Sequence, residues 1–431
     1  MKAKLARRFQ SLLLLCLIAT RSGAHAQGGE GYASATELLV AFSGEDAKKY
    51  EPFFRYSPQG KIVDIELHAV GTDGMTARYT DEPKPWEWVN NILRIKTADG
   101  YEAISGVATY HDTGYSDDHL QLMKTVVEDL KNLKTLDPVE VREIMTEKHP
   151  DLTDEALSSI DIALWDLAAR KANLPFHKFF GSNRSSIKSY ASIPFYDTVA
   201  EHLEAVDEYA KRGYEAFKFH VWGRVEEDAK LVKAVNEKYA GTRYRFMGDH
   251  ESAYNFEDAM TLGKMMDDEL FIWFEAPISD MLFDQYRALK DELKMSLVPT
   301  GYQYYSADFM REGIKKQAWD AGRFDVTVVG GYTKALELMI IADEAELPIE
   351  IQSWGPTLSQ AANLHLMLAN DRTEFFEQPT PKEAFEFGMI NGNMFRAGKN
   401  VAPGGPGLGI EVDWDILSTA DFYRFSNDVS R

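Results

Sequence analysis

The spacing of hydrophobic positions between residues 31 and 181 first follows the two-residue period of β-strands. Residues 62–70 alternate between apolar and polar side chains. Two further apolar runs, 88–96 and 101–107, flank Ala98-Asp99-Gly100, which is a strong turn signal. The pattern therefore predicts a strand followed by a β-hairpin.

The same region then changes to helical periodicity, which extends over residues 117–148. Another helix is predicted to begin at Thr153, whose side chain can cap it, and to end near Asn173-Leu174-Pro175. Strands followed by helices indicate a separate α+β domain over residues 31–181. Its loops at 72–83 and 110–116 are rich in polar and aromatic residues, which suits either a lid over a site elsewhere or plain solvated loops.

From residue 187 onward, one short β-type run and one helical interval alternate repeatedly. The predicted strands are 187–193, 216–221, 244–248, 271–274, 295–299, 325–329, 348–351 and 374–376. Eight such units predict an α/β fold, a (β/α)8-type barrel over 187–395 with the α+β domain as its N-terminal cap. The turn-rich stretch 402–409 opens a C-terminal segment, 396–431, that is expected to return to the cap.

Polar and ionisable residues stand where these predicted strands end. The set is Lys218, His220, Asp249, Glu275, Tyr302, Asp325, Gln352 and Glu377. Parallel strands of an α/β fold place their carboxyl ends together, where ligands bind. Asp249 and Glu275 on adjacent strands suit a hard divalent cation. The alternative for each acid alone is a cap on the following helix.

Several motifs in order along the chain resemble the enolase superfamily, within its mandelate racemase and muconate lactonizing enzyme branch. They are the helical stretch Ser159-Ile-Asp-Ile-Ala-Leu-Trp-Asp-Leu, the pair Lys218 and His220, Asp249, Glu275, Gly330-Gly331, and Pro406-Gly407-Leu408-Gly409. The resemblance covers roughly residues 93–413. It implies a capped barrel whose carboxylates bind Mg²⁺ and a shared step, the abstraction of the proton next to a substrate carboxylate.

Lys218 and His220 are two residues apart on one strand, so both are expected to point into the barrel. A neighbouring ammonium favours the neutral imidazole, which leaves His220 able to accept a proton. The interpretation is that His220 is the base, while Lys218 meets the substrate carboxylate. An incidental Lys and His on a surface strand is the alternative.

The chain departs from the resembling family at the third metal ligand. That acidic or amide ligand follows a Gly at the end of the fifth strand, where this chain has Tyr302 after Gly301. A neutral phenol, with a reference pKa of about 10, is a poor magnesium ligand. Either Glu251, Gln303 or water completes the shell, or metal binding is weak or lost. Tyr302 is then an acid or a hydrogen-bond donor to substrate.

A second departure is the missing histidine of the family's His-Asp dyad. Asp325 matches the acid before Gly330-Gly331, but Gln352 stands where the histidine is expected. An amide takes no proton, so a reaction served from one face is favoured over two-base racemisation. His365 lies on an apolar helix, which indicates a packed residue. Glu377 matches a family acid near the substrate, with helix capping as the alternative.

The composition and the N-terminal sequence limit the binding partners and the location that can be expected for the protein. The net charge of −21 argues against nucleic-acid phosphates as a partner. Basic residues before the apolar run 12–19, and Ala24-His25-Ala26 after it, predict a cleaved signal peptide over 1–26, export to the periplasm, and no membrane attachment afterwards. The single cysteine, Cys16, lies inside that segment. A homo-oligomer is expected only by analogy with the family.

The leading hypothesis is a magnesium-assisted dehydratase acting on a small-molecule carboxylate, a hydroxylated or sugar acid. His220 and Lys218 serve the proton transfer, Asp249 and Glu275 hold the metal, and Tyr302 or the protonated base helps a β-hydroxyl to depart. A racemase, epimerase or cycloisomerase is the alternative among enzymes. An exported binding protein that has lost turnover is the alternative from another class.

Overall fold

The computed structural model describes residues 58–71, 76–80, 86–110, 115–267, 270–301 and 306–426. The expected signal peptide at 1–26 and the predicted site residues Tyr302 and Gln303 lie outside the described residues. Among the helices that are described, none is both long enough and apolar enough to cross a lipid bilayer.

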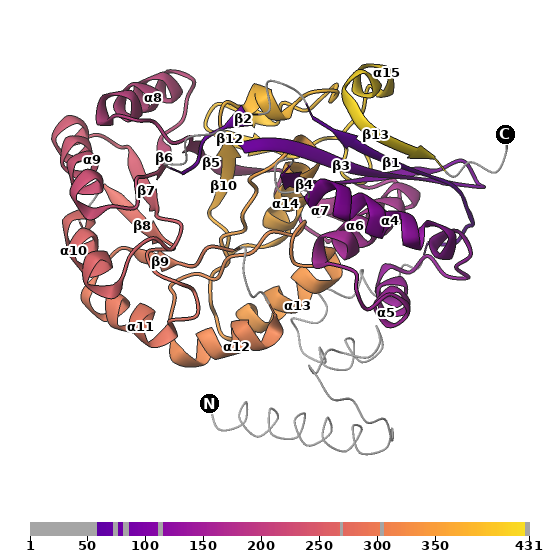
Figure 1. The fold of residues 1–431 in the computed structure, drawn as a ribbon, viewed down its shortest axis with the longest axis horizontal. Coiled ribbons are helices and arrows are strands. Elements are labelled where there is room, and N and C mark those ends of the chain that lie inside the picture. Colours follow the sequence, from indigo (N-terminus) through magenta and orange to yellow (C-terminus); the bar gives the residue numbers. More distant parts are fainter. Residues whose placement is uncertain are drawn as a thin grey trace, which may run out of the picture.

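One antiparallel sheet belongs to the cap. Its strands are β1 (Ile62–Val70), β2 (Thr76–Ala77), β3 (Trp86–Thr97), β4 (Glu102–Tyr110) and β13 (Asp421–Ser426). The predicted hairpin joins β3 to β4, and Gly100 has the left-handed φ of 86° that its turn requires. Strand β13, from the far end of the chain, pairs antiparallel with β1. The N- and C-terminal parts of the described chain thus share this sheet (Figure 1).

Four helices belong to the cap. They are α4 (Tyr115–Lys131), α5 (Pro138–Lys148), α6 (Asp154–Lys171) and the short α7 (Phe176–Phe179). Two of them, α4 and α6, pack on this sheet. The periodicity predicted over 117–148 is therefore two helices, because the Asp137 side chain accepts bonds from Val139 and Glu140 and begins a new helix with Pro138 in its first turn. Thr153 caps α6 as predicted.

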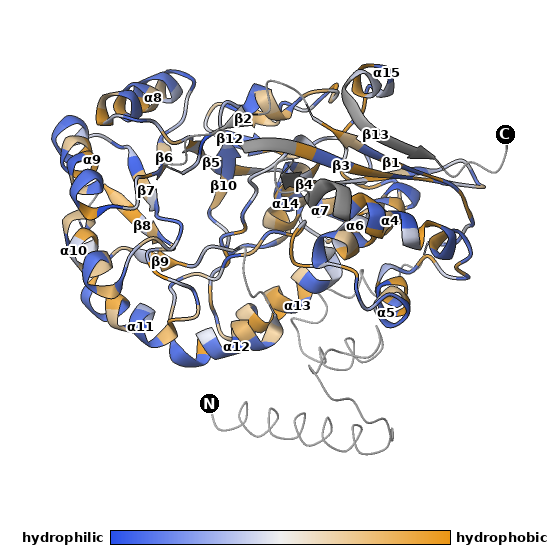
Figure 2. Cartoon of the chain, viewed as in Figure 1, coloured by the Kyte–Doolittle hydropathy of each residue, from blue (hydrophilic) through white to orange (hydrophobic). Residues whose placement is uncertain are grey.

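The barrel wall begins with parallel strands around a central axis, and helices cover its outside (Figure 1). The strands are β5 (Ser186–Ile193), β6 (Ala216–His220), β7 (Arg245–Asp249), β8 (Phe271–Glu275), β9 (Ser296–Val298) and β10 (Phe375–Pro379). The helices are α8 (Val199–Lys211), α9 (Val225–Tyr239), α10 (Phe256–Met266), α11 (Phe283–Glu292), α12 (Ala307–Lys316), α13 (Gly331–Glu344) and α14 (Thr357–Ala369). Figure 2 shows that many of these helices carry both hydrophilic and hydrophobic faces, as a barrel coat requires.

Two wall segments differ from the prediction. Residues 326–330 form a turn instead of the strand expected over 325–329, and the strand expected over 348–351 makes only the isolated bridge between Gly322 and Ile349. The β-branched run after Asp325 suggested a strand. The Asp325 carboxylate instead accepts bonds from the backbone and hydroxyl of Thr327, both at 2.7 Å, which stabilises the turn.

The barrel closes through these irregular segments. Asp320 N–H donates to Leu297 O at 3.0 Å, and Glu350 N–H donates to Gly322 O at 2.9 Å. Strand β10 then pairs in parallel with β5. Inside the wall, a cluster of buried side chains fills the barrel below its mouth. Its members are Tyr190, Ala216, Met247, Trp273, Val298, Ala321 and Phe375.

Helix α6 joins the cap to the barrel through two buried acids. Asp161 accepts from Thr333 N–H at 3.1 Å, and Asp166 accepts from Leu408 N–H at 2.6 Å. A Cβ on Gly331 would lie 2.3 Å from Asp161 Oδ1, and one on Gly407 would lie 1.9 Å from Asp166 Oδ1. The Gly-Gly and Pro-Gly-Leu-Gly motifs are therefore explained by close approach to α6, with both glycines at positive φ.

Candidate functional site

The candidate site lies where adjacent parallel strands end at the same level. In the sheet register, His220 of β6 stands beside Asp249 of β7, and Asp249 stands beside Glu275 of β8. Lys218 lies two positions before His220 and shares its inward direction. All four side chains are buried. The alternation of these strands is what brings the predicted residues together.

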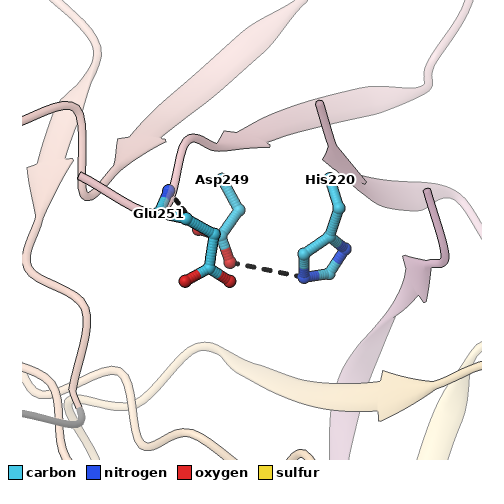
Figure 3. A group of neighbouring side chains, drawn as sticks. All are labelled: His220, Asp249 and Glu251. Carbon is cyan, nitrogen blue, oxygen red and sulfur yellow. Dashed lines mark hydrogen bonds and ion pairs between the residues drawn. The ribbon is translucent and has the colours of Figure 1, made fainter. Parts of the chain in front are cut away.

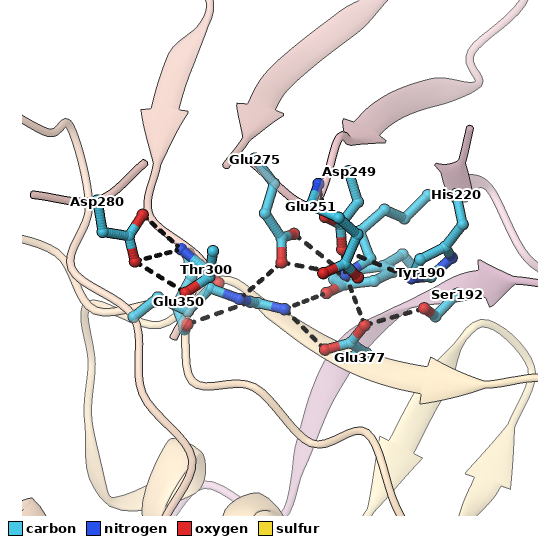
Figure 4. A network of polar contacts seen from close by, with 12 residues as sticks. Tyr190, Ser192, His220, Asp249, Glu251, Glu275, Asp280, Thr300, Glu350 and Glu377 are labelled. Carbon is cyan, nitrogen blue, oxygen red and sulfur yellow. Dashed lines mark hydrogen bonds and ion pairs between the residues drawn. The ribbon is translucent and has the colours of Figure 1, made fainter. Parts of the chain in front are cut away.

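Lys218 is the centre of a buried charge cluster, and Figure 4 labels the three carboxylates around it, Asp249, Glu275 and Glu377. Its Nζ lies 2.9 Å from Asp249 Oδ2, 3.1 Å from Glu275 Oε2 and 2.7 Å from Glu377 Oε1. Burial opposes the ammonium, but the three carboxylates raise the pKa of Lys218 well above its ordinary value. Lys218 is therefore held as a cation and is not available as a base near neutral pH.

Arg323 is the part of this cluster that the sequence reasoning missed. Its Nε lies 3.0 Å from Glu275 Oε1 and its Nη2 lies 2.7 Å from Glu377 Oε2, with the side chain fully buried. Although burial opposes ionisation, Lys218 and then Arg323 lower the pKa of Glu377 to about 2. Because the sixth strand was predicted over 325–329, Arg323 was placed before the wall, whereas the structure brings the chain into the wall at Gly322, which bridges to Ile349. An arginine between Gly322 and Phe324 was the available signal.

His220 is held in one tautomer by its own surroundings. Its Nδ1 lies 2.8 Å from Ile193 O, which can only accept, so Nδ1 carries the proton and Nε2 carries the lone pair. Nε2 faces Asp249 Oδ2 at 3.5 Å (Figure 3). Burial lowers the pKa of His220 to about 4, which keeps the ring neutral. A neutral imidazole with a free Nε2 is the form that accepts a proton.

A cap residue covers this imidazole. The ring of Tyr79 meets the His220 ring edge-on, with centroids 4.7 Å apart, and its hydroxyl donates to Thr380 O at 3.1 Å. The preceding residue is also fixed, since Arg78 O accepts from Phe195 N–H at 2.6 Å. Within the predicted loop 72–83, residues 78–80 thus lie over the barrel mouth. This is the position of a covering segment, and not of a solvated loop.

Glu251 brings a further carboxylate beside Asp249. Possible ligand atoms of His220, Asp249 and Glu251 all lie within 4.8 Å of one another (Figure 3). Glu251 and Ser252 both have left-handed backbones, with φ of 49° and 61°, a strained conformation that turns the chain back at the strand end. Water reaches the Glu251 side chain, yet desolvation by the surrounding protein and then the Asp249 charge raise its pKa to about 8.

This arrangement fits a hard divalent cation. The oxygen donors are of the type that Mg²⁺ prefers. A cation between Asp249 and Glu251 would also relieve the repulsion that contributes to the raised pKa of Glu251. Glu275, which already meets Lys218 and Arg323, adjoins Asp249 on the next strand. The residues present are therefore compatible with Mg²⁺ at the end of β7.

The remaining predicted residues separate into two groups. Gln352 and Glu377 are buried on the other half of the wall, and Glu377 joins the charge cluster. Asp325 instead bonds to Thr327 and to Asn363 Nδ2 at 2.9 Å, and burial raises its pKa to about 6. Among the described residues, no hydrogen bond or ion pair joins Asp325 to the Lys218 cluster, although the Glu377 charge also contributes to its raised pKa, and its catalytic role stays a prediction. His365 packs against His177 in the helical layer, as predicted.

Two family models match the chain. The model for "Enolase C-terminal domain-like" proteins matches residues 201–416, and the model for the "Mandelate racemase / muconate lactonizing enzyme, N-terminal domain" matches residues 88–181. The chain belongs to the enolase superfamily. Within it, the two models together place the protein in the mandelate racemase and muconate lactonizing enzyme branch, which confirms the resemblance and the predicted fold class.

Superfamily relatives differ in their named activities. Arabinonate dehydratase of Saccharolobus solfataricus is 26% identical over 340 residues, 74% of this chain and 87% of its own length. D-galactarolactone cycloisomerase of Agrobacterium fabrum is 28% identical over 285 residues, 61% of this chain and 73% of its own. At these identities the relatives support an enzyme that abstracts the proton next to a carboxylate, and not one particular product.

Solved structures agree on the superfamily fold. A mandelate racemase/muconate lactonizing enzyme-type protein from Pseudovibrio sp. has a TM-score of 0.82 and 33% identity, and the match covers 86% of this chain and 99% of that chain. L-talarate dehydratase from Polaromonas sp., complexed with Mg and L-glucarate, has a TM-score of 0.73 at 20% identity, covering 85% and 99%. The second likeness shows the fold alone.

Proposed function

We propose that this protein removes the proton next to the carboxylate of a hydroxylated acid and that the β-hydroxyl is then lost as water. The observation that carries the proposal is the fixed tautomer of His220, which presents an unprotonated Nε2 beside Asp249. Membership of the superfamily supports the first step, and the dehydratases among the relatives support the second.

In this proposal His220 Nε2 takes the α-proton, while Nδ1–H remains bonded to Ile193 O. The imidazolium that forms is stabilised by the Asp249 carboxylate at 3.5 Å. Lys218 remains a cation throughout, because its three carboxylate partners stabilise the ammonium. It supplies positive charge beside the substrate carboxylate. Tyr79 keeps water off the imidazole.

Mg²⁺ would be held by Asp249 and Glu275, with Glu251 as the third carboxylate. When bound, it supplies Lewis-acid stabilisation of the negative charge on the substrate carboxylate. The Glu251 carboxylate is already turned toward this position by its backbone (Figure 3). Among the three candidates that the sequence offered to complete the metal shell, Glu251, Gln303 and water, we therefore choose Glu251.

A cycloisomerase is the second candidate function, because D-galactarolactone cycloisomerase is 28% identical to this chain. It shares the first proton transfer and differs in the second step. Loss of water changes the mass of the product by one water, whereas isomerisation leaves the composition unchanged. The two candidates are therefore separated by the product alone.

The test is proton exchange in heavy water with a panel of sugar acids and their lactones, with and without Mg²⁺, monitored by NMR. Exchange that depends on Mg²⁺ and is accompanied by loss of water supports the dehydratase. Exchange with unchanged composition replaces it with an isomerase. If no acid exchanges although calorimetry shows sugar-acid binding, the proposal is wrong and the protein is a binding protein.

A further inference from the structure

Gln352 is a buried side chain whose amide oxygen is unpaired among the described residues. Only 5% of the residue is exposed, and its Oε1 has no hydrogen-bond partner. Its backbone N–H donates to Phe324 O at 2.9 Å. A buried amide oxygen left unpaired carries the desolvation cost of its burial without a hydrogen bond that offsets it.

The amide lies at the mouth of the barrel, near the candidate site. A Cβ on Gly301, just past the end of β9, would lie 3.0 Å from Gln352 Oε1 and 2.8 Å from Arg323 Cγ. The next residue, Ser353, donates its hydroxyl to Glu377 O at 2.7 Å. Gln352 thus lies between the ends of β9 and β10, next to Arg323 and Glu377, on the half of the wall that does not carry His220.

A comparison with Gln360 shows how two buried glutamines of this barrel differ. Gln360 is also buried, at 3% exposure, but its Nε2 donates to Gly355 O at 2.6 Å and its Oε1 accepts from Gln378 at 3.1 Å. Gln360 therefore has the partners that a structural glutamine needs. Gln352 Oε1 has none among the described residues and lies at the barrel mouth, where a ligand can supply one.

The chemistry of an amide limits what this ligand group is. It offers one acceptor and two donors, and exchanging its oxygen and nitrogen by a half-turn does not change that set. A hydroxyl can donate and accept, so it satisfies the amide in either orientation, whereas a C–H group leaves it unpaired. An amide is neither protonated nor ionised near neutral pH, so Gln352 binds without acting as a second base.

We propose that Gln352 recognises a hydroxyl group on the carbon chain of the substrate and makes the enzyme specific for hydroxylated over deoxygenated acids. This inference rests on the proposed function and adds to it a substrate group and the residue that recognises it. A site built to pair a substrate hydroxyl discriminates strongly against the analogue without it, because the protein amide is then left unpaired.

The experiment compares wild type, Gln352→Leu and Gln360→Leu. For each, kcat/KM of proton exchange is measured with sugar acids and with analogues that lack one hydroxyl at successive carbons. Gln352→Leu should reduce the preference for one particular hydroxyl about 10- to 100-fold. Because Gln352→Leu removes an unpaired amide oxygen, this variant should also unfold at a Tm equal to or above that of wild type. Gln360→Leu should lower the Tm and leave the preference unchanged.

Ligand-induced shifts in Tm on the same acid pairs measure binding without turnover. If Gln352→Leu keeps the full hydroxyl preference in both readouts, or loses stability as Gln360→Leu does, the inference is wrong while the proposed function stands. If wild type exchanges no acid at all, the proposed function fails, and the inference fails with it.

Discussion

The two halves of the barrel wall are built differently. From β5 to β9, neighbouring strands pair in register through their backbones, and each functional side chain takes its direction from that pairing. In the other half, side chains replace much of the ladder. Glu350 accepts from the backbone N–H groups of Glu374 and Phe375, and Thr373 donates its hydroxyl to Ile349 O.

The two halves of the wall also carry different functional groups. The regular half holds His220, the proposed proton acceptor, the Lys218 ammonium and two of the candidate metal ligands. The irregular half holds a cation, Arg323, and an unpaired amide, Gln352. A regular ladder fixes groups that must keep sub-ångström positions, while a wall held by side chains tolerates new groups that tune charge and recognition. Substitutions in each half can break or sharpen this division.

The largest effect is expected at His220. His220→Gln removes the proton acceptor and should lower α-proton exchange by about 10³-fold, within the usual range for a general base. The measurement is the initial rate of exchange by NMR. His149→Gln, on the cap, should exchange at the wild-type rate. An unchanged rate in His220→Gln, with a native circular dichroism spectrum, would show that the base lies elsewhere.

The next effect concerns stability. Arg323→Met removes one of the two buried cations, Arg323 and Lys218, that Glu275 and Glu377 share, and should lower the free energy of unfolding by about 3–5 kcal/mol. The matched control is Arg372→Met, whose partner Asp343 lies 3.5 Å away at the surface. That change should cost less than about 1 kcal/mol. Equal losses in urea denaturation would mean that the buried guanidinium has no special role.

A third prediction uses the Glu350 contacts that replace part of the ladder. Burial raises the pKa of Glu350 to about 7, above its ordinary value of 4.5. Between these values the folded protein holds a proton that the unfolded chain has released, so stability falls as pH rises through this window. Glu350→Gln removes the part of this pH dependence that comes from Glu350, which is about 3 kcal/mol of unfolding free energy.

The measurement for Glu350 is the difference in unfolding free energy between the Gln variant and wild type, taken at pH 5 and at pH 8. It should shift in favour of the variant by up to about 3 kcal/mol between the two pH values. A difference that does not change with pH would show that Glu350 titrates normally.

The smallest effect is on metal affinity. Glu251→Gln removes one proposed ligand charge and should weaken Mg²⁺ binding at least about tenfold, since even changes beyond the ligands themselves have effects of that size. Calorimetric titration measures it, with the exposed Glu257→Gln on α10 as control. Identical affinities for both variants would remove Glu251 from the metal site.

The sequence was sufficient wherever a side chain's direction is set by strand alternation. Lys218 and His220 were expected on one inward face, and Asp249 and Glu275 at adjacent strand ends, and the structure places them there. The cap hairpin and the start of α6 were also predicted, because turn and capping residues act locally. In these places one physical rule decides the outcome.

Elsewhere the outcome depends on particular side-chain contacts that the composition of a segment does not show, and several of these join residues distant in sequence. The run after Asp325 has strand composition, yet the Asp325 side chain bonds to Thr327 and makes a turn. The place of Arg323 in the charge cluster follows from its contacts with Glu275 and Glu377, which its own segment of sequence does not show. Tyr79 covers His220 across 141 positions of sequence, a distance over which no local pattern carries information. At such sites side-chain contacts decide the structure, and not the secondary-structure propensity of the local sequence.

We propose that this barrel removes a proton from one face of its substrate only, because His220 lies on one half of the wall and an amide, Gln352, on the other. The most direct test incubates each epimer of a reactive acid, differing at the α-carbon, in heavy water and monitors both by NMR. We expect one epimer to exchange its α-proton or lose water, while the other stays unchanged. Interconversion of the two epimers would contradict the claim, because that requires a second base.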